Sequence, residues 1–119
     1  MVSLNSQELA QYVADLSLEK KADNVKILNL ENLTSISDYF VICSGDSEVQ
    51  VKAISDHILD SLKDRKIKVW HKEGYQAFNW VLLDLIDVVV HIFKPEVREH
   101  YALEKFWGDA KTIEVKDES

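Results

Sequence analysis

The sequence predicts an α+β fold, that is, a mixed α/β domain in which helices flank a single mixed sheet. The run at residues 80–93 is the most apolar and β-branched part of the chain, and its pattern indicates two adjacent strands at the sheet centre. Helical and strand-like patterns alternate elsewhere in the chain. A length of 119 residues, with 46% hydrophobic and 29% charged residues, is typical of one soluble domain with its own core.

The first part of the chain predicts a helix followed by two strands. Ser6 is the expected N-cap of an amphipathic helix that ends near residues 19–21. A polar pair at residues 23–24 interrupts it, and a first strand is expected over residues 25–30. The apolar run at residues 39–43 then predicts a second, buried strand.

A long helix and a third strand are expected next. Asp46 or Ser47 can cap a helix whose apolar residues, spaced by three and four, extend to Leu62. The alternation at residues 67–71 predicts a half-exposed strand. Strand, helix and strand over residues 39–71 indicate a βαβ unit, so we expect its two strands to be parallel with a right-handed crossover.

The run at residues 80–93 predicts a hairpin, and a last helix follows it. The two strands are joined too tightly for any other connection, and both are expected to be covered on both faces. Pro95 ends the second strand, and a helical segment extends from there to Gly108. We expect one domain over residues 1–110 and a charged, frayed tail over residues 111–119.

The net charge of the chain limits the classes of partner that it is expected to bind. With 14 Lys and Arg against 21 Asp and Glu, the net charge of -7 is unfavourable for binding a nucleic-acid backbone and fits a basic partner better. The alternative is that the acidity only keeps the protein soluble. No signal-peptide pattern and no long apolar run occurs, so we expect a cytoplasmic protein without a membrane span. Cys43, the single cysteine, is expected to be a buried, inert thiol.

Few patterns are typical of catalysis or metal binding. Gly45 precedes a helix as a phosphate-binding loop would, but Asp46 and Glu48 and the lack of a glycine-rich motif favour a simple helix cap. Asp84 and Asp87 are three residues apart on a hairpin, which favours a turn role over a shared metal site. The four histidines fall on separate elements, so no metal site and no cofactor are predicted.

Strand alternation places an unusual group of side chains on one sheet face. Trp80, Leu82 and Asp84 share a face, and His91 shares a face with its alternate neighbours on the following strand. The aromatic residues near turns or element ends are Tyr75, Trp80, Tyr101 and Trp107. Such positions are enriched in protein interfaces, although core packing explains them as well. Core packing is favoured for Trp107, whereas an interface role for Trp80 is at least as good an interpretation.

Longer motifs occur in order along the chain. They are ISDYFVICSG at 36–45, VKAISD at 51–56, EGY at 73–75, WVLLDL at 80–85, DVVVHIF at 87–93 and YALEKFWGDA at 101–110. In this order and spacing they resemble the ribosomal silencing factor family, also called Iojap-like proteins. Two residues depart from that family's usual pattern. Ile86 stands where a turn glycine is usual, and Glu48 stands where a basic or neutral polar residue is common. Because isoleucine tolerates positive φ poorly, the turn geometry is expected to differ locally.

The resemblance implies a nucleotidyltransferase-like architecture without the catalytic acidic pair, and so a binding protein rather than an enzyme. It implies binding to the large ribosomal subunit through its protein fourteen, with little direct nucleic-acid contact. Such binding obstructs joining of the small subunit and represses translation when nutrients are scarce. A homodimer is expected when the protein is free.

The partner-binding residues that the resemblance implies are Glu73, Gly74, Tyr75, Trp80, Leu82, Asp84 and His91. One alternative is a nucleotidyltransferase-like enzyme that uses Asp84 or Asp87 with Mg²⁺. A second alternative is a homodimeric scaffold for some other protein.

Overall fold

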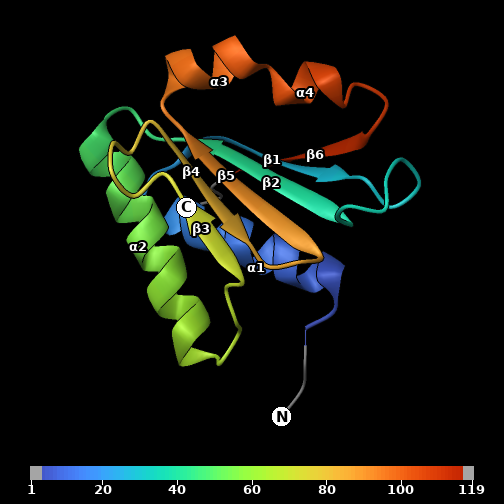
Figure 1. The fold of residues 1–119 in the computed structure, drawn as a ribbon, viewed down its shortest axis with the longest axis horizontal. Helices are drawn as coiled ribbons and strands as arrows, with labels where there is room; N and C mark the ends of the chain where they lie inside the picture. The colour runs from blue at the N-terminus through green and yellow to red at the C-terminus, as the bar shows by residue number, and fades with distance from the viewer. Residues whose placement is uncertain (1–3, 117–119) are drawn as a thin grey trace.

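Six strands form one sheet in the order β3-β4-β5-β2-β1-β6 (Figure 1). The structure, a computed structural model, describes residues 4–116. The elements are α1 (Ser6–Glu19), β1 (Asp23–Asn29), β2 (Tyr39–Ser44), α2 (Glu48–Asp64), β3 (His71–Glu73), β4 (Trp80–Asp84), β5 (Val88–Phe93), α3 (Pro95–Tyr101), α4 (Leu103–Phe106) and β6 (Lys111–Val115). β2 and β5 are parallel neighbours, and the other neighbouring pairs are antiparallel. The predicted α+β class with one mixed sheet is confirmed.

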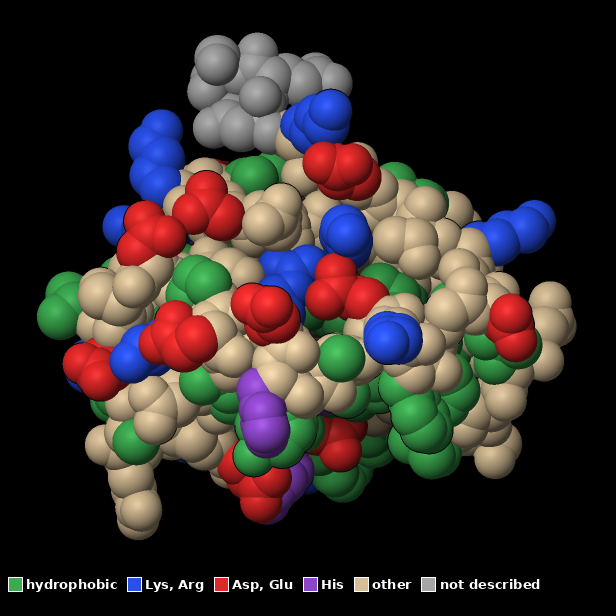
Figure 2. Space-filling model, turned by 90° about the horizontal axis from the view of Figure 1, so that it is seen from above, with side chains coloured by type: hydrophobic (Ala, Val, Ile, Leu, Met, Phe, Trp, Pro, Cys, Tyr) green, Lys and Arg blue, Asp and Glu red, His purple; other side chains and the backbone are tan. Residues whose placement is uncertain are grey.

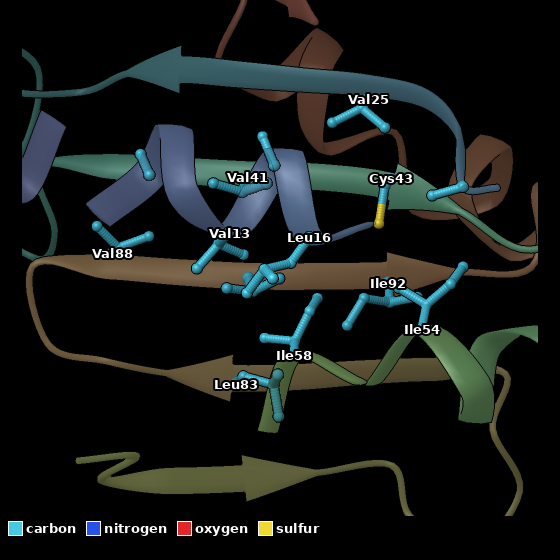
Figure 3. Packing of buried hydrophobic residues seen from close by; sticks show 14 of the residues in the cluster. Val13, Leu16, Val25, Val41, Cys43, Ile54, Ile58, Leu83, Val88 and Ile92 are labelled. Atoms are coloured by element: carbon cyan, nitrogen blue, oxygen red, sulfur yellow. The ribbon is translucent and has the colours of Figure 1, made fainter. Parts of the chain in front are cut away.

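Helices cover both faces of the sheet. The long helices α1 and α2 pack on one face, here called the inner face, and the short helices α3 and α4 lie over the other, the outer face (Figure 1). Figure 3 shows apolar side chains of α1 and α2 meeting those of the central strands. On the outer face a smaller cluster joins Leu28 and Phe93 to Leu103 and Trp107, so Trp107 packs against the core as predicted. Cys43 is buried as predicted, and burial raises the pKa of its thiol to about 12.

Side-chain caps begin the two long helices. Asn5, rather than the predicted Ser6, caps α1: its Oδ1 accepts the N–H of Glu8 at 2.8 Å, and the Glu8 carboxylate accepts the N–H of Asn5 at 3.0 Å. This reciprocal pair satisfies two donors that the helix itself leaves unpaired. Ser47 caps α2 by accepting the N–H of Gln50 at 3.2 Å. The loop before α2 therefore serves as a helix start, which is the interpretation that the sequence favoured.

The third strand lies further along the chain than predicted. The prediction of a strand at residues 67–71 is wrong, since β3 comprises His71–Glu73, and Ile67 and Val69 pack against the inner core without joining the sheet. The predicted parallel direction of the two strands in the βαβ unit is confirmed, and its right-handed crossover stays a prediction. β3 and β2 run parallel, but β4 and β5 lie between them. β5 is the parallel neighbour of β2 because the most apolar strand occupies the sheet centre.

The predicted single C-terminal helix is wrong, because the segment forms two short helices. Ala102 adopts a left-handed backbone with φ 50°, which ends α3 before α4 begins. Arg98 bridges the break: it donates to both carboxylate oxygens of Glu104, at 3.0 and 2.8 Å, and to the hydroxyl of Ser44 at 2.9 Å. The Arg98 hydrogen bonds hold the pKa of Glu104 below its usual value. This network joins α3, α4 and β2.

The tail is not frayed where the structure describes it. Residues Lys111–Val115 form β6, which pairs antiparallel with β1. The prediction of a frayed tail is therefore wrong for this segment. Its backbone hydrogen bonds come from a strand near the start of the chain, a partner that local charge does not reveal. Residues 117–119 of the predicted tail lie outside the described residues.

β4 and β5 form the predicted hairpin with the predicted alternation. Val81 and Leu83 are buried, whereas Trp80, Leu82 and Asp84 are only partly buried. All six residues of β5 are buried. The expectation that both strands are covered on both faces is right for β5 and wrong for β4. The short outer helices do not cover the whole outer face of β4.

The hairpin turn holds Ile86, which stands where a turn glycine is usual in the family, at a positive φ. Ile86 has φ 74°, in the left-handed region, and its side chain is 48% exposed. The carboxylate of Asp84 accepts the N–H of Ile86 at 2.8 Å and holds the turn. A β-branched residue is unfavourable at such a backbone angle.

Ile86→Gly is therefore expected to raise the free energy of unfolding by about 1 kcal/mol, because glycine adopts positive φ without steric cost. Urea denaturation at pH 7 measures the change. Ile86→Ala is the matched control, since it shortens the side chain but keeps the Cβ atom and should bring no comparable gain. If the glycine variant were no more stable than the alanine variant, the positive φ at residue 86 would not be a source of strain.

Candidate partner-binding face

The outer face is open where β3 and β4 form the sheet edge. Glu73 lies opposite Leu82, and Leu82 lies opposite His91 of β5, so the three side chains share a face. Trp80 and Asp84 belong to the same face because side chains alternate along β4. The structure thus brings together five of the predicted partner-binding residues. They are Glu73, Trp80, Leu82, Asp84 and His91.

Trp80 is held between the sheet and α3. Its ring stacks on Phe93 at a centroid distance of 4.8 Å and lies against Tyr101 at 4.7 Å. The indole N–H donates to Nδ1 of His91 at 3.1 Å. Trp80 therefore has a packed side and a fixed orientation, and its remaining edge faces outward.

His91 supports this face from beneath. It is only 3% exposed, and its pKa is lowered from 6.5 to about 4 by burial, so the ring is neutral at pH 7. Because Nδ1 accepts the Trp80 hydrogen bond, the ring proton resides on Nε2. That Nε2 atom is buried without a hydrogen-bond partner among residues 4–116, and the Phe40 ring lies 4.6 Å from the imidazole. His91 is therefore buried beneath this face, where it orients the Trp80 ring.

Gly74 and Tyr75 have different roles in the same loop. Gly74 has φ 94°, and a Cβ atom there would lie 2.0 Å from the carbonyl oxygen of Trp80, so only glycine fits. Tyr75 packs on the inner-face side, where its hydroxyl donates to the Asp56 carboxylate at 3.0 Å. Burial, followed by this hydrogen bond, raises the pKa of Tyr75. The structure thus separates Tyr75 from the other predicted contact residues.

A shallow cleft of about 410 Å³ lies between the loop before β4 and α3. It is lined by Gly74, Ala77, Asn79, Trp80, Glu96, Val97, His100 and Tyr101. The sequence interpretation did not include Glu96, Val97 or His100 among the site residues. Their spacing along one side of a helix was the available signal, but nothing local indicated that this side would meet Trp80.

The outer face carries acidic charge beside apolar surface. Figure 2 views the molecule from this side and shows acidic and basic side chains interspersed among patches of apolar side chains. Glu73 is largely exposed at the β3 edge, where its carboxylate lies 3.2 Å from His71. Glu96 lies at the cleft, and its carboxylate is 3.3 Å from Lys94. The open part of the outer face therefore presents Glu73 at the sheet edge and Glu96 at the cleft beside Trp80 and Tyr101.

A sequence model of the family described as "Ribosomal silencing factor during starvation" matches residues 3–119. The chain belongs to this family. Ribosomal silencing factor RsfS of Halalkalibacterium halodurans is 42% identical over 113 residues, which are 95% of this chain and 97% of that protein. RsfS of Bacillus subtilis is 40% identical over 94% of this chain and 95% of its own. A crystal structure of a Chromobacterium violaceum protein, 31% identical, aligns with a TM-score of 0.86 over 96% of this chain and 95% of its own.

Membership in the silencing factor family confirms the resemblance carried by the motifs of residues 36–110. The second departure from the family pattern, Glu48, has a charged partner in this fold. Glu48 lies in the first turn of α2, and its carboxylate is 3.4 Å from the ammonium of Lys94. This contact ties the start of α2 to the end of the hairpin.

The two hairpin aspartates make different structural contacts. Asp84 accepts the N–H of Ile86, which confirms the predicted turn role. The carbonyl oxygen of Asp87 accepts the N–H groups of Asp38 and Tyr39 at 2.9 and 3.1 Å. Within residues 4–116, no three His, Cys, Asp or Glu side chains gather closely enough to hold a metal ion. No helix in that part of the chain combines the length and apolarity that a membrane crossing requires.

The burial of His91 predicts a specific pH dependence of stability. The unfolded chain protonates this ring near its ordinary pKa of 6.5, whereas the folded chain does so only near pH 4. Between these values the unfolded state binds more protons, so the free energy of unfolding falls as the pH is lowered. From pH 7 to pH 5 the wild type should lose about 2 kcal/mol more than His91→Gln. Urea denaturation at both pH values measures this difference.

Glutamine is chosen because its amide oxygen can accept the Trp80 indole hydrogen bond. His100→Gln, at an exposed position on α3, is the control and should keep the wild-type pH dependence. Equal losses in the wild type and in His91→Gln would show that His91 is not held neutral by the fold.

Proposed function

We propose that the protein binds the large ribosomal subunit through ribosomal protein fourteen, at the surface where the small subunit joins. Bound there, it prevents subunit joining and represses translation when nutrients are limiting. The observation that carries this proposal is the family membership, with 42% identity to an RsfS protein over 95% of the chain. The family description, which names ribosomal silencing during starvation, supports the same role.

The open part of the outer face is the contact surface that we propose. Glu73, Leu82 and the outward edge of Trp80 contact the partner, and Gly74 keeps the neighbouring loop close to β4. Glu73 and Glu96 supply negative charge that complements a basic ribosomal protein and orients its approach. Contacts through this face are made to protein, with little direct contact to nucleic acid.

The other predicted residues support this surface. Asp84 holds the hairpin turn, and His91 orients Trp80. Tyr75 anchors the loop to α2 from the inner side through Asp56. We place all three among the positioning residues of the interface.

Obstruction of subunit joining requires neither catalysis nor a cofactor. We therefore propose that the protein is not an enzyme. From the family resemblance we also propose that it acts in the cytoplasm and forms a homodimer when it is free.

Co-sedimentation with isolated ribosomal subunits on a density gradient tests the proposal. The wild type should migrate with the large subunit only and reduce the fraction of joined ribosomes. Glu73→Lys reverses one exposed charge of the proposed surface and should weaken binding about tenfold. Glu73 is a better test position than Trp80, because Trp80 also packs against Phe93.

Glu114→Lys is the matched control. Glu114 is also exposed and also lies on an edge strand, but it is on β6 at the opposite edge of the sheet. Its reversal should leave binding unchanged. Protein that stays at the top of the gradient with both subunits would overturn the proposed function, and equal losses in the two variants would overturn the proposed surface.

A thermal-shift measurement with ATP or GTP and Mg²⁺ discriminates against the nucleotidyltransferase-like alternative. A nucleotide that binds the folded protein, present at a free concentration 100 times its Kd, would raise the free energy of unfolding by about 2.7 kcal/mol. We expect no shift, because the Asp84 carboxylate is committed to the turn. A saturable rise in Tm that requires Mg²⁺ and is lost in Asp87→Asn would favour the enzyme instead.

A further inference from the structure

A second surface hollow lies on the inner side of the sheet, where α2 ends and the chain turns toward β3. This region is at the lower left of Figure 1, away from α3 and α4. The hollow measures about 570 Å³ and is lined by Leu59, Asp60, Lys63, Lys66, Ile67, Lys68, Val69 and Lys72. Because four of its eight lining residues are lysines, it is called the lysine groove below. Its lining combines aliphatic side chains with lysines and contains one acidic residue.

The lysine groove concentrates positive charge in an acidic protein. The chain has 14 Lys and Arg and a net charge of -7. Five of those basic residues fall within residues 63–72, together with a single acidic residue, Asp64. Lysine near a helix C-terminus complements the helix dipole, which accounts for Lys63. Lys66, Lys68 and Lys72 lie beyond the helix end, so the dipole does not explain them.

Within the part of the chain that the structure describes, the groove lysines form no close ion pair with a carboxylate, and Lys72 interacts at longer range with Asp56. None of the ion pairs found among residues 4–116 involves any of these four lysines. Asp60 lines the groove as the one acidic group among them. Like charges brought together on a surface repel, and they create a local positive potential that attracts an anionic partner.

Aromatic rings accompany these lysines. The Lys68 ammonium lies 3.7 Å from the centroid of the Trp70 ring, and the Lys72 ammonium lies 4.5 Å from that of Tyr75. Trp70 follows the groove-lining Val69 in the chain and is 57% exposed, so part of its ring is open to solvent. An exposed aromatic ring with adjacent cations is the combination that binds single-stranded nucleic acid, since bases stack on the ring and phosphates meet the cations.

We propose that the lysine groove binds single-stranded RNA. The four lysine ammoniums contact successive phosphates, and a base stacks on Trp70. This contact is independent of the outer face, because β3 separates the two surfaces: Glu73 shares a face with Leu82, and Lys72 shares the opposite face with Leu83. The protein can therefore hold a basic protein on one side of β3 and an RNA strand on the other.

Fluorescence anisotropy with a fluorescein-labelled, 12-nucleotide single-stranded RNA of mixed sequence tests the proposal. Four phosphate contacts predict that binding weakens about 50-fold between 50 and 200 mM salt. Lys68→Gln with Lys72→Gln removes half of these contacts, so the salt effect should shrink to about sevenfold and binding at 50 mM should weaken. Lys105→Gln with Lys111→Gln changes net charge equally, at exposed positions on α4 and β6, and should retain wild-type binding.

Trp70→Ala separates stacking from charge. It should weaken RNA binding by about fivefold or more while leaving the salt dependence unchanged. Phe106→Ala removes an aromatic side chain that is 77% exposed on α4 and should have no effect. All variants alter exposed side chains, and an unchanged Tm verifies that each is folded.

Three results would overturn the proposal. They are absence of saturable RNA binding at 50 mM salt, equal weakening in the two lysine double variants, and binding to phosphatidylserine vesicles without binding to RNA. Because the probe is isolated RNA, these outcomes are separate from the ribosome co-sedimentation. Loss of one activity does not imply loss of the other.

Discussion

The burial of β5 on both faces is the constraint on which the rest of the structure depends. All six of its residues are buried, so the strand needs an apolar layer on each side. α1 and α2 form one layer, and α3 and α4 form the other. His91 is the single polar side chain of this strand. Its Nδ1 atom accepts a hydrogen bond from the indole N–H of Trp80. Central burial and the orientation of Trp80 are therefore linked.

The two layers are unequal, and this inequality creates the candidate surfaces. α1 and α2 have 14 and 17 residues, whereas α3 and α4 have only seven and four. The outer face consequently stays open over β3 and β4, where Glu96 and Trp80 line the same cleft. On the other side of β3, lysines gather at the end of α2. Net charge averages over these two surfaces and so describes neither.

The errors in the sequence interpretation have common causes. β6 was missed because its partner is β1, far away along the chain, and its charged residues resemble a tail. The strand at residues 67–71 was misplaced because Ile67 and Val69 alternate with polar residues but pack on the core outside the sheet. The break at Ala102 was missed because the Arg98 network that bridges it connects three elements. Each error involves either a contact between residues that are far apart in the sequence or a backbone conformation that the hydrophobic pattern does not predict.

By itself, the sequence determined the α+β class, the central hairpin, the shared face of Trp80, Leu82 and Asp84, and the family through its ordered motifs. These depend on alternation, helical spacing and turn residues, which act between positions close in the chain. Only the tertiary structure decided that β5 lies between β4 and β2, that Tyr75 faces away from Trp80, and that the lysines form a groove. The physical reason is that strand order and surface neighbours follow from long-range pairing and unequal coverage by helices, which no local pattern specifies.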